Sequence, residues 1–224
     1  MNTKTSLILS LVVNVILLAL LGYKHGAADV TQPKMNLNSQ GIEDMRGNRL
    51  SEVSVVMLGN SITYQGNWQE ELERDDVFNG GKPGWTTQQL SWVIKDFIIP
   101  HKPKICFFKG GTNDISLGIP TERIIQNMQM VMDSIQAVGT IPVYTPTIYF
   151  NDSSAPNGKI DQVNDSMKSF CIQKNYHFMD FRPVLCGDQQ TRDAFYKEDN
   201  THLHQKAYEP WAKMVEEVLA SYGI

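Results

Sequence analysis

The stretch from residue 55 to 68, VVMLGNSITYQGNW, constrains the fold of this chain more than any other. An apolar run leads into a polar turn at Gly59, Asn60 and Ser61, and a segment that favours a helix follows. We therefore expect a buried strand that delivers a serine to the edge of a sheet, at the start of a helix. The first N–H groups of a helix have no intrahelical partner, so this serine would present a free hydroxyl and a free amide. Both suit a nucleophile whose own N–H binds an oxyanion, although Gly-Asn-Ser is also common at a simple helix cap.

From residue 52 onward, short apolar runs alternate with longer amphipathic segments. Expected strands cover 53–58, 76–78, 105–108, 141–144 and 177–179, and expected helices cover 68–74, 86–99, 121–138, 160–174 and 205–222. This alternation favours parallel strands with helices on both faces. We predict an α/β fold, a three-layer α/β/α doubly wound parallel sheet, whose ligand-binding residues follow the carboxyl ends of strands.

The N-terminus has the composition of a targeting segment. Lys4 precedes an apolar run over residues 7–21, which is typical of a secretory signal peptide or a retained signal anchor. We predict a signal peptide or anchor at 1–28, a polar tether at 29–51 and one domain at 52–224. The domain is then exported, periplasmic or membrane-anchored, and contacts a membrane only through this segment. Whether the segment is cleaved stays open.

Composition excludes some classes of function. The net charge is -4, the pI is near 5.7, and Lys and Arg are scattered, so no nucleic-acid-binding surface is expected. Cys106, Cys171 and Cys186 lack the spacing of metal ligands, and we expect neither a metal nor a cofactor. A bridge between Cys171 and Cys186 stays open, and the oligomeric state is unknown from the sequence.

Four short blocks follow one another in an order typical of one family. They are Gly59-Asn60-Ser61-Ile62-Thr63, the run NGGKPGWTT at 79–87, Gly111-Thr112-Asn113-Asp114 and Asp199-Asn200-Thr201-His202. Each block alone is a weak signal. Together, at these spacings, they resemble the SGNH hydrolases, the flavodoxin-like GDSL-type esterases and lipases. The resemblance covers residues 53 to about 222 and implies that fold, with ester hydrolysis by a serine.

The resemblance assigns Ser61 as the nucleophile, with His202 and Asp199 as base and acid. Physical chemistry supports this, because an unassisted hydroxyl is a poor nucleophile near neutral pH. On a turn before a helix, the three-residue spacing lets Asp199 reach Nδ1–H of His202 while Nε2 faces Ser61. The carboxylate then holds the imidazole in the useful tautomer. The other histidines are assigned to surface or packing roles: His25, His101, His177 and His204.

The resemblance also implies an oxyanion hole made by the N–H of Ser61, the N–H of Gly84 and the side-chain amide of Asn113. The carbonyl oxygen of an ester becomes negatively charged during attack, so such donors must already be in place. A glycine at position 84 suits a close approach of the backbone to the substrate.

Two departures from the family pattern bear on the substrate pocket. Asn60 stands where the family usually has Asp, and we expect it to keep a structural hydrogen bond, so that activity survives. Trp85 stands beside the oxyanion glycine, where it would narrow the acyl pocket, offer a face to a sugar ring, or instead pack on the following helix. Trp68 is a candidate second wall, so the predicted pocket residues are Asn60, Trp68 and Trp85.

The sequence therefore predicts an exported serine esterase that removes short acyl groups, above all acetyl, from carbohydrates or other small hydroxyl compounds. An acyltransferase with the same triad and a lipid acyl hydrolase, such as a lysophospholipase or thioesterase, are alternatives. A catalytically inactive glycan-binding module at the cell surface is a third.

Overall fold

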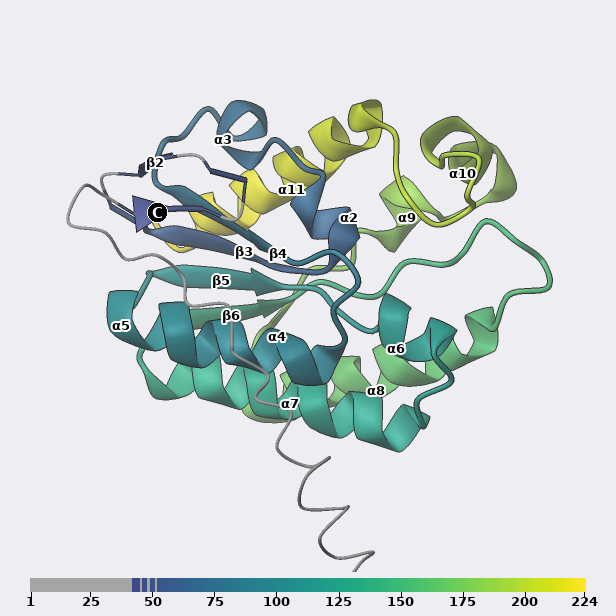
Figure 1. Ribbon diagram of the computed structural model, residues 1–224, viewed down its shortest axis with the longest axis horizontal. Helices are drawn as coiled ribbons and strands as arrows, with labels where there is room; N and C mark the ends of the chain where they lie inside the picture. Colours follow the sequence, from purple (N-terminus) through teal and green to yellow (C-terminus); the bar gives the residue numbers. More distant parts are fainter. Residues whose placement is uncertain (1–41, 45, 48, 51) are drawn as a thin grey trace, which may run out of the picture. The chain divides into compact units, whose positions relative to one another are not determined.

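The computed structural model describes residues 42–44, 46–47, 49–50 and 52–224 (Figure 1). A five-stranded, all-parallel sheet lies at its centre, with the strand order β4-β3-β5-β6-β7. Its strands are β3 (Val55–Gly59), β4 (Val77–Gly81), β5 (Ile105–Phe108), β6 (Ile141–Tyr144) and β7 (His177–Phe178). This order reverses direction beside β3, the strand that leads to Ser61. The predicted fold class, a doubly wound parallel sheet, is confirmed.

Both faces of the sheet are buried because successive side chains of a strand point to opposite faces. In β3, Val55 and Met57 join one apolar core, whereas Val56 and Leu58 join the other. All four side chains are at most 1% exposed. A continuous apolar run, instead of an alternating one, is therefore the pattern that this strand requires.

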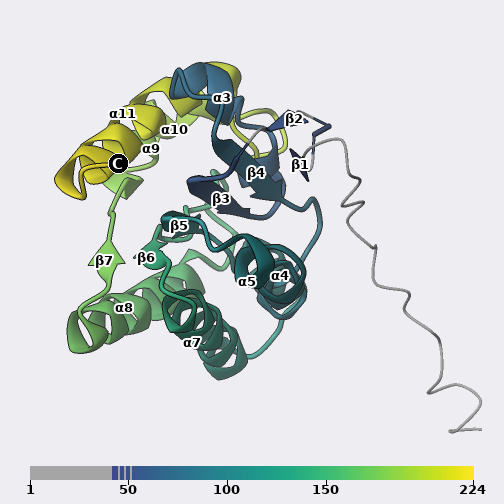
Figure 2. The ribbon, with the colours of Figure 1, turned by 90° about the vertical axis from the view of Figure 1, so that its left-hand side faces the viewer.

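Helices cover each face, as Figure 2 shows. One face carries α4 (Thr87–Val93), the π-helix η1 (Ile94–Ile98), α5 (Ile99–His101), α7 (Thr121–Ala137) and α8 (Asn157–Lys174). The other carries α2 (Ser61–Tyr64), α3 (Trp68–Glu71), α9 (Arg182–Leu185), α10 (Gln189–Phe195), the 3-10 turn η2 (Gln205–Ala207) and α11 (Tyr208–Ser221). A further short helix, α6 (Thr112–Ser116), follows β5.

Several elements differ from the sequence prediction. The run Asn79-Gly80-Gly81 continues strand β4 instead of ending it, because these residues pair in parallel register with the end of β3. Position 81 requires glycine, since a Cβ there would meet the backbone N of Tyr64 at 2.2 Å. The helix expected to end before Pro100 continues to His101. The N–H of Ile99 bonds to the carbonyl of Ile94, and this π-type widening precedes the proline, which has no N–H to donate. The short helices α6, α9 and α10 were not predicted.

The segment expected to be a tether contains two short strands. β1 (Ile42–Glu43) pairs antiparallel with β2 (Arg49–Leu50), and Leu50 is 3% exposed within the core that contains α4 and α7. Arg46 donates to the carbonyl of Gly66 at 2.9 Å, which ties this segment to the turn after α2. Its described part therefore packs on the domain.

Residues 1–41, and with them the predicted signal segment, lie outside the described residues. Among the helices that the structure describes, none has the length and apolar character needed to span a membrane. The three cysteines are buried and free. Cys171 belongs to the core on one face of the sheet and Cys186 to the core on the other, so the sheet separates them and they form no bridge.

Candidate active site

The turn after β3 presents Ser61 at the carboxyl edge of the sheet. Ser61 is the first residue of α2 and is partly exposed. Asn60 caps this helix: its side-chain oxygen accepts the N–H of Ile62 at 3.2 Å. Within the described part of the chain, the N–H of Ser61 has no acceptor. The turn therefore exposes both a hydroxyl and a free amide N–H, as the first donors of a helix require.

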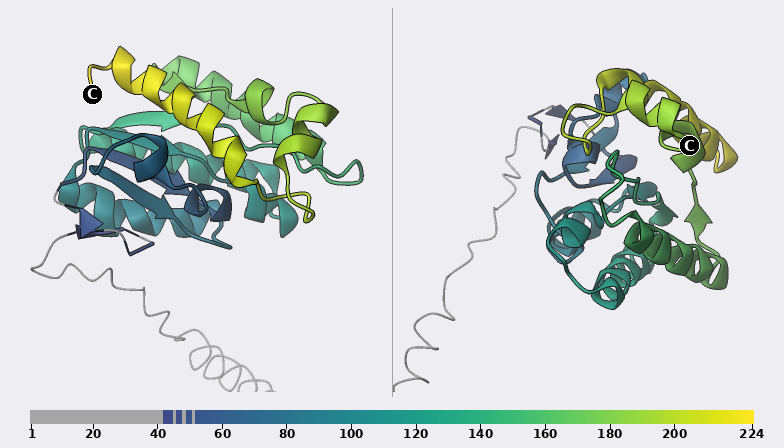
Figure 3. Two further views of the ribbon diagram at one scale, coloured as in Figure 1. Left: turned by 90° about the horizontal axis from the view of Figure 1, so that it is seen from above. Right: turned by 90° about the vertical axis from the view of Figure 1, so that its right-hand side faces the viewer.

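The loop between α10 and α11 carries Asp199 and His202, and the contact of His202 with Ser61 places it at the same edge. Figure 3 shows the course of this part of the chain in yellow-green and yellow. Asn200 adopts a left-handed backbone with φ 57°, which folds the loop back on itself. One oxygen of Asp199 accepts the N–H of Thr201 at 3.0 Å and that of His202 at 2.8 Å. This carboxylate thus shapes the loop through one oxygen and leaves the other for the imidazole.

Ser61, His202 and Asp199 form a continuous hydrogen-bonded chain. Nδ1 of His202 lies 2.6 Å from the second oxygen of Asp199, and Nε2 lies 2.8 Å from Oγ of Ser61. Burial raises the pKa of the Asp199 carboxyl, but hydrogen bonds from the backbone and ring of His202 outweigh it and hold the pKa at about 2. An ionised carboxylate can only accept, so Nδ1 carries the proton and Nε2 accepts from the serine hydroxyl.

The Asp199–His202 contact orients the site more than it stabilises the fold. The side chain of Asp199 is 51% exposed and that of His202 is 26% exposed. Solvent screens charge interactions at such positions, and exposed pairs contribute about 0–1 kcal/mol to stability.

Gly84 lies in a tight turn beside this chain. The N–H of Trp85 bonds to the carbonyl of Lys82 at 3.3 Å, and Gly84 has φ 76°. Proline followed by a residue with positive φ is the pattern of a type II turn, which explains the Lys-Pro-Gly-Trp sequence. The N–H of Lys82 donates to the carbonyl of Gly59 at 2.8 Å, so the turn is attached to the strand that leads to Ser61. Gly84 is exposed, and its N–H has no acceptor among the described residues.

Asn113 lies on α6 and is tied to the same turn. Its side-chain amide donates to the carbonyl of Trp85 at 2.8 Å, and the second N–H of that amide has no acceptor among the described residues. The next residue, Asp114, is buried and accepts the backbone N–H and the hydroxyl of Thr87 at 2.9 and 2.6 Å. These contacts fix α6 against the start of α4, and so fix Asn113 beside Gly84.

Two of the predicted pocket residues lie in the interior instead. Trp68 is 1% exposed, packs edge-to-face on Trp211 at 4.7 Å and donates its indole N–H to the carbonyl of Thr63 at 2.8 Å. Asn60 is 0% exposed and acts as the helix cap described above. The expectation that Trp68 and Asn60 line a substrate pocket is therefore wrong, because both are enclosed by the core below α2.

Trp85 is partly buried and packs on α4. Its ring meets Trp92 edge-to-face at 5.5 Å, and the ammonium of Lys82 lies 5.3 Å from the ring centroid. This corresponds to the alternative in which the indole packs on the following helix. One ring face is then shared with Lys82, which limits how Trp85 can meet an acyl chain.

Sequence reasoning gave no role to three lysines near the site. Lys197 donates to the side chain of Gln65 at 2.8 Å, which joins the Asp199–His202 loop to α2. Lys109 follows β5, is 1% exposed, and has no partner for its amine among the described residues. Burial lowers the pKa of Lys109 to about 7. In the sequence, Lys82 stood out only as the single charged residue of the run NGGKPGWTT at 79–87.

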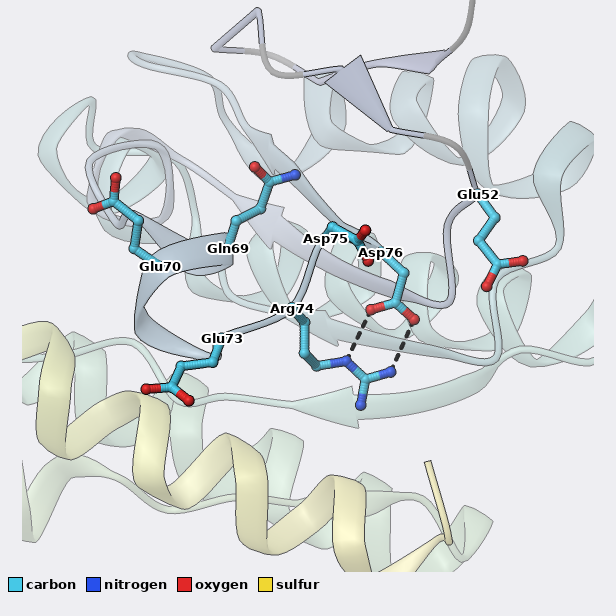
Figure 4. Close-up of a pocket in the computed structure, with 7 residues that line it drawn as sticks. All are labelled: Glu52, Gln69, Glu70, Glu73, Arg74, Asp75 and Asp76. Atoms are coloured by element: carbon cyan, nitrogen blue, oxygen red, sulfur yellow. Dashed lines mark hydrogen bonds and ion pairs between the residues drawn. The ribbon is translucent and has the colours of Figure 1, made fainter.

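A depression in the surface lies at the opposite end of the sheet from Ser61 (Figure 4). It is lined by residues just before β3 and β4 and from α3: Glu52, Gln69, Glu70, Glu73, Arg74, Asp75 and Asp76. Arg74 and Asp76 form a two-point ion pair with both distances 2.8 Å. Throughout the described ranges, no group of three His, Cys, Asp or Glu residues is placed to hold a metal ion.

Comparison with known proteins identifies the class. The sequence profile of the GDSL-like lipase/acylhydrolase family matches residues 57–209, a range that includes all four blocks. The chain belongs to this family, and the protein is a carboxylic ester hydrolase. No curated relative matches the sequence.

Solved structures share the fold at low identity. A GDSL-like lipase from Bacteroides thetaiotaomicron is 17% identical with a TM-score of 0.66, over 75% of this chain and 88% of that one. An acetyl xylan esterase is 18% identical with a TM-score of 0.64, over 74% and 98%. A family 3 carbohydrate esterase from Clostridium thermocellum is 19% identical with a TM-score of 0.60, over 76% and 96%.

Proposed function

We propose that this hydrolase is a serine esterase that removes short acyl groups, above all acetyl, from carbohydrates or other small hydroxyl compounds. The single observation that carries the proposal is the chain Asp199–His202–Ser61, with distances of 2.6 and 2.8 Å. It contains a nucleophile, a base within reach of its proton, and a carboxylate that orients the base.

In the first step, Oγ of Ser61 forms a bond to the ester carbonyl carbon and its proton passes to Nε2 of His202. The negative charge develops on the carbonyl oxygen, where the free N–H groups of Ser61 and Gly84 and the amide of Asn113 stabilise it. The bond to the alcohol then breaks, and His202 returns the proton to the leaving oxygen. Asp199 stays ionised throughout and stabilises the imidazolium.

In the second step, water attacks the acyl group on Ser61 with the same base and the same donors. Hydrolysis in the absence of an added alcohol separates this reaction from acyl transfer. The same activity excludes an inactive binding module.

The proposed acyl group and alcohol are drawn from the likeness to solved esterases and from the residues beside Gly84. The likeness to an acetyl xylan esterase and to a carbohydrate esterase is a likeness of fold, at 18% and 19% identity. The turn that holds Gly84 is tied to α6 through Asn113 and to α4 through the contact of Trp85 with Trp92. Trp85 therefore holds a fixed place beside the oxyanion glycine, and the proposed preference for a short acyl group rests on the bulk of this indole.

A substrate series tests this proposal. The purified domain should hydrolyse an aryl acetate and acetylated sugars with a higher kcat/KM than the matched aryl octanoate or a lysophospholipid, and Ser61→Ala should abolish both activities. An octanoate rate equal to or above the acetate rate would point to a lipid acyl hydrolase instead.

We also propose that the segment at 1–28 places the domain outside the cytoplasm, because an apolar run follows a positive residue. Protease should degrade the domain in cells whose outer layers have been opened but whose inner membrane is intact. Full protection until the inner membrane is broken would contradict export.

A further inference from the structure

Lys82 holds a fixed position next to the oxyanion turn. Its N–H bonds to the carbonyl of Gly59, two residues before Ser61, and its carbonyl accepts the N–H of Trp85. The other end of the turn is held by Asn113, which donates to the carbonyl of Trp85 at 2.8 Å. Lys82 and Trp85 therefore stand on either side of Gly84, one at each end of the turn.

The ammonium of Lys82 is partly buried and has no counter-ion in the part of the chain that the structure describes. Five ion pairs occur within the described ranges, at Arg74, Lys174, Arg182, His202 and Lys213, and Lys82 belongs to none of them. Its three N–H donors also have no hydrogen-bond acceptor among the described residues. Within the described ranges, the ammonium of Lys82 contacts the ring of Trp85, whose centroid is 5.3 Å away.

Burying an unpaired cation costs free energy, so its presence suggests that a ligand pairs with it. Burial lowers the pKa of Lys82, because removal of water disfavours the charged form. Contact with an indole returns about 0.5–2 kcal/mol, but it leaves the hydrogen-bond donors unused. A carboxylate brought by a ligand would satisfy both the charge and the donors.

We propose that Lys82 binds a carboxylate on the substrate, so that the preferred esters are those of acidic sugars or other acidic hydroxyl compounds. This inference rests on the esterase function proposed above. If the transferred group is acetyl, it carries no charge, so the carboxylate belongs to the alcohol part of the ester. The ring of Trp85 then lies beside the same part of the substrate. The protein as a whole is negative, at -4, so attraction of an anion depends on local cations such as this one.

The test uses two substrates that differ in one charge: an acetylated methyl glucuronide, and the same compound with its carboxyl group converted to the neutral methyl ester, with release of acetate measured for both. The unmodified enzyme should prefer the acid by at least about tenfold in kcat/KM, mostly through KM, as a charge-assisted hydrogen bond of about 1.5–3 kcal/mol predicts. Lys82→Met should lose that preference and hydrolyse the neutral ester at a similar rate. Lys82→Arg should retain most of it.

Two controls distinguish recognition from a structural effect. Lys168 also lies over an aromatic ring, 5.9 Å from the centroid of Phe178, but it is exposed on α8. Lys168→Met should leave both rates unchanged. Raising NaCl from about 20 to about 500 mM should reduce the preference of the unmodified enzyme, because salt screens the attraction.

An unmodified enzyme that hydrolyses both esters equally well would overturn the role of Lys82 and leave the esterase function standing. The same conclusion would follow if Lys82→Met slowed both esters by the same factor. If neither ester nor an aryl acetate is hydrolysed, the proposed function fails, and the inference about Lys82 fails with it.

Discussion

The two ends of the parallel sheet both carry charged and polar groups, but these groups are paired with one another at the amino end and, in the part of the chain that the structure describes, left without partners at the carboxyl end. At the amino end, Arg74 and Asp76 satisfy each other at 2.8 Å, and hydrogen bonding to Arg74 lowers the pKa of the Asp76 carboxyl against the opposing effect of burial. At the carboxyl end, the N–H groups of Ser61 and Gly84 and the ammonium of Lys82 have no acceptor among the described residues. A depression in the surface is therefore a poorer guide to the reactive site than donors left without partners.

The energetic cost of an unpartnered group depends on its burial: Gly84 is exposed, so its N–H is open to water, whereas the amine of Lys109 is buried and has no partner among the described residues. A buried donor without an acceptor destabilises a protein by roughly 1–3 kcal/mol. We propose that the carboxyl end binds the transition state and so keeps its donors available, whereas the charged groups of the amino end are free to satisfy one another. We therefore expect that removing an unpaired charge near the carboxyl end raises stability, whereas removing a paired charge at the amino end lowers it. Substitutions at the carboxyl end should also change activity far more than those at the amino end.

The largest effect is expected at the nucleophile. Ser61→Ala and His202→Ala should each lower kcat by a factor on the order of 10⁵–10⁶, because these groups act as a unit. Circular dichroism and thermal melting should show that both variants stay folded. Near-normal turnover by folded Ser61→Ala protein would rule out the mechanism.

Asp199→Asn should lower kcat by about 10⁴, because an amide no longer favours the tautomer with the proton on Nδ1. Stability should change little, since the pair is largely exposed. The pKa of about 2 also means that loss of activity on acidification does not report Asp199. Measured pH profiles of kcat/KM for both proteins check this. A rate for Asp199→Asn within tenfold of the parent would contradict an orienting role for this carboxylate.

Asn113→Ala should lower kcat by about 10²–10³, the usual loss of one oxyanion donor. It also removes the hydrogen bond to the carbonyl of Trp85, so a melting curve must accompany the kinetics. The effect should appear in kcat more than in KM. If kcat/KM fell by the same factor through a higher KM, with kcat unchanged, Asn113 would instead contribute to binding of the ground state.

Lys109→Met should stabilise the protein at low pH. The pKa of Lys109 falls from 10.5 to about 7 through burial, so the unfolded state binds more protons between these two values. The free energy of unfolding of the parent therefore falls as pH drops from about 10 to about 7, and the deficit persists below that. Methionine removes this term, so the variant should exceed the parent in melting temperature most clearly at about pH 6. A variant that is less stable than its parent at this pH would contradict an unpaired buried amine.

The smallest effect is expected at the amino end. Arg74→Met should destabilise the protein by about 1 kcal/mol, as partly exposed ion pairs do. The kcat/KM for an aryl acetate should change by less than about threefold, because distant sites act independently. A large loss of activity would mean that this depression takes part in the reaction, and the contrast between the two ends would fail.

The sequence predicted most of the fold because apolar runs and their lengths determine buried strands and covering helices. The strands at 105–108 and 141–144 were placed correctly for this reason. The short helix α6 depends on tertiary contacts, including those of Asp114 with Thr87, which no local pattern reveals. The helix α10 does carry a local signal, because Asp188 caps it by accepting the N–H of Thr191, and the sequence prediction missed it. The hairpin at 42–50 is short and polar, so its pairing was also hidden.

For the site, the motifs named the residues that the structure brings together as a hydrogen-bonded chain, but not their surroundings. Trp68 has the size of a pocket wall, yet its place in the core follows from contacts with Trp211 on α11, more than 100 residues away. Lys82 became significant only when the structure showed that its charge is unpaired. Sequence motifs therefore identify the reacting residues more readily than they identify the residues that surround them.

The central claim is that Ser61 is the nucleophile and that His202 activates it. A fluorophosphonate probe, followed by digestion and mass spectrometry, tests it directly. We expect a single label on the peptide containing Ser61, no label in Ser61→Ala, and far slower labelling in His202→Ala. An active enzyme that is labelled at another residue, or one that resists the probe and keeps its full activity, would contradict the account.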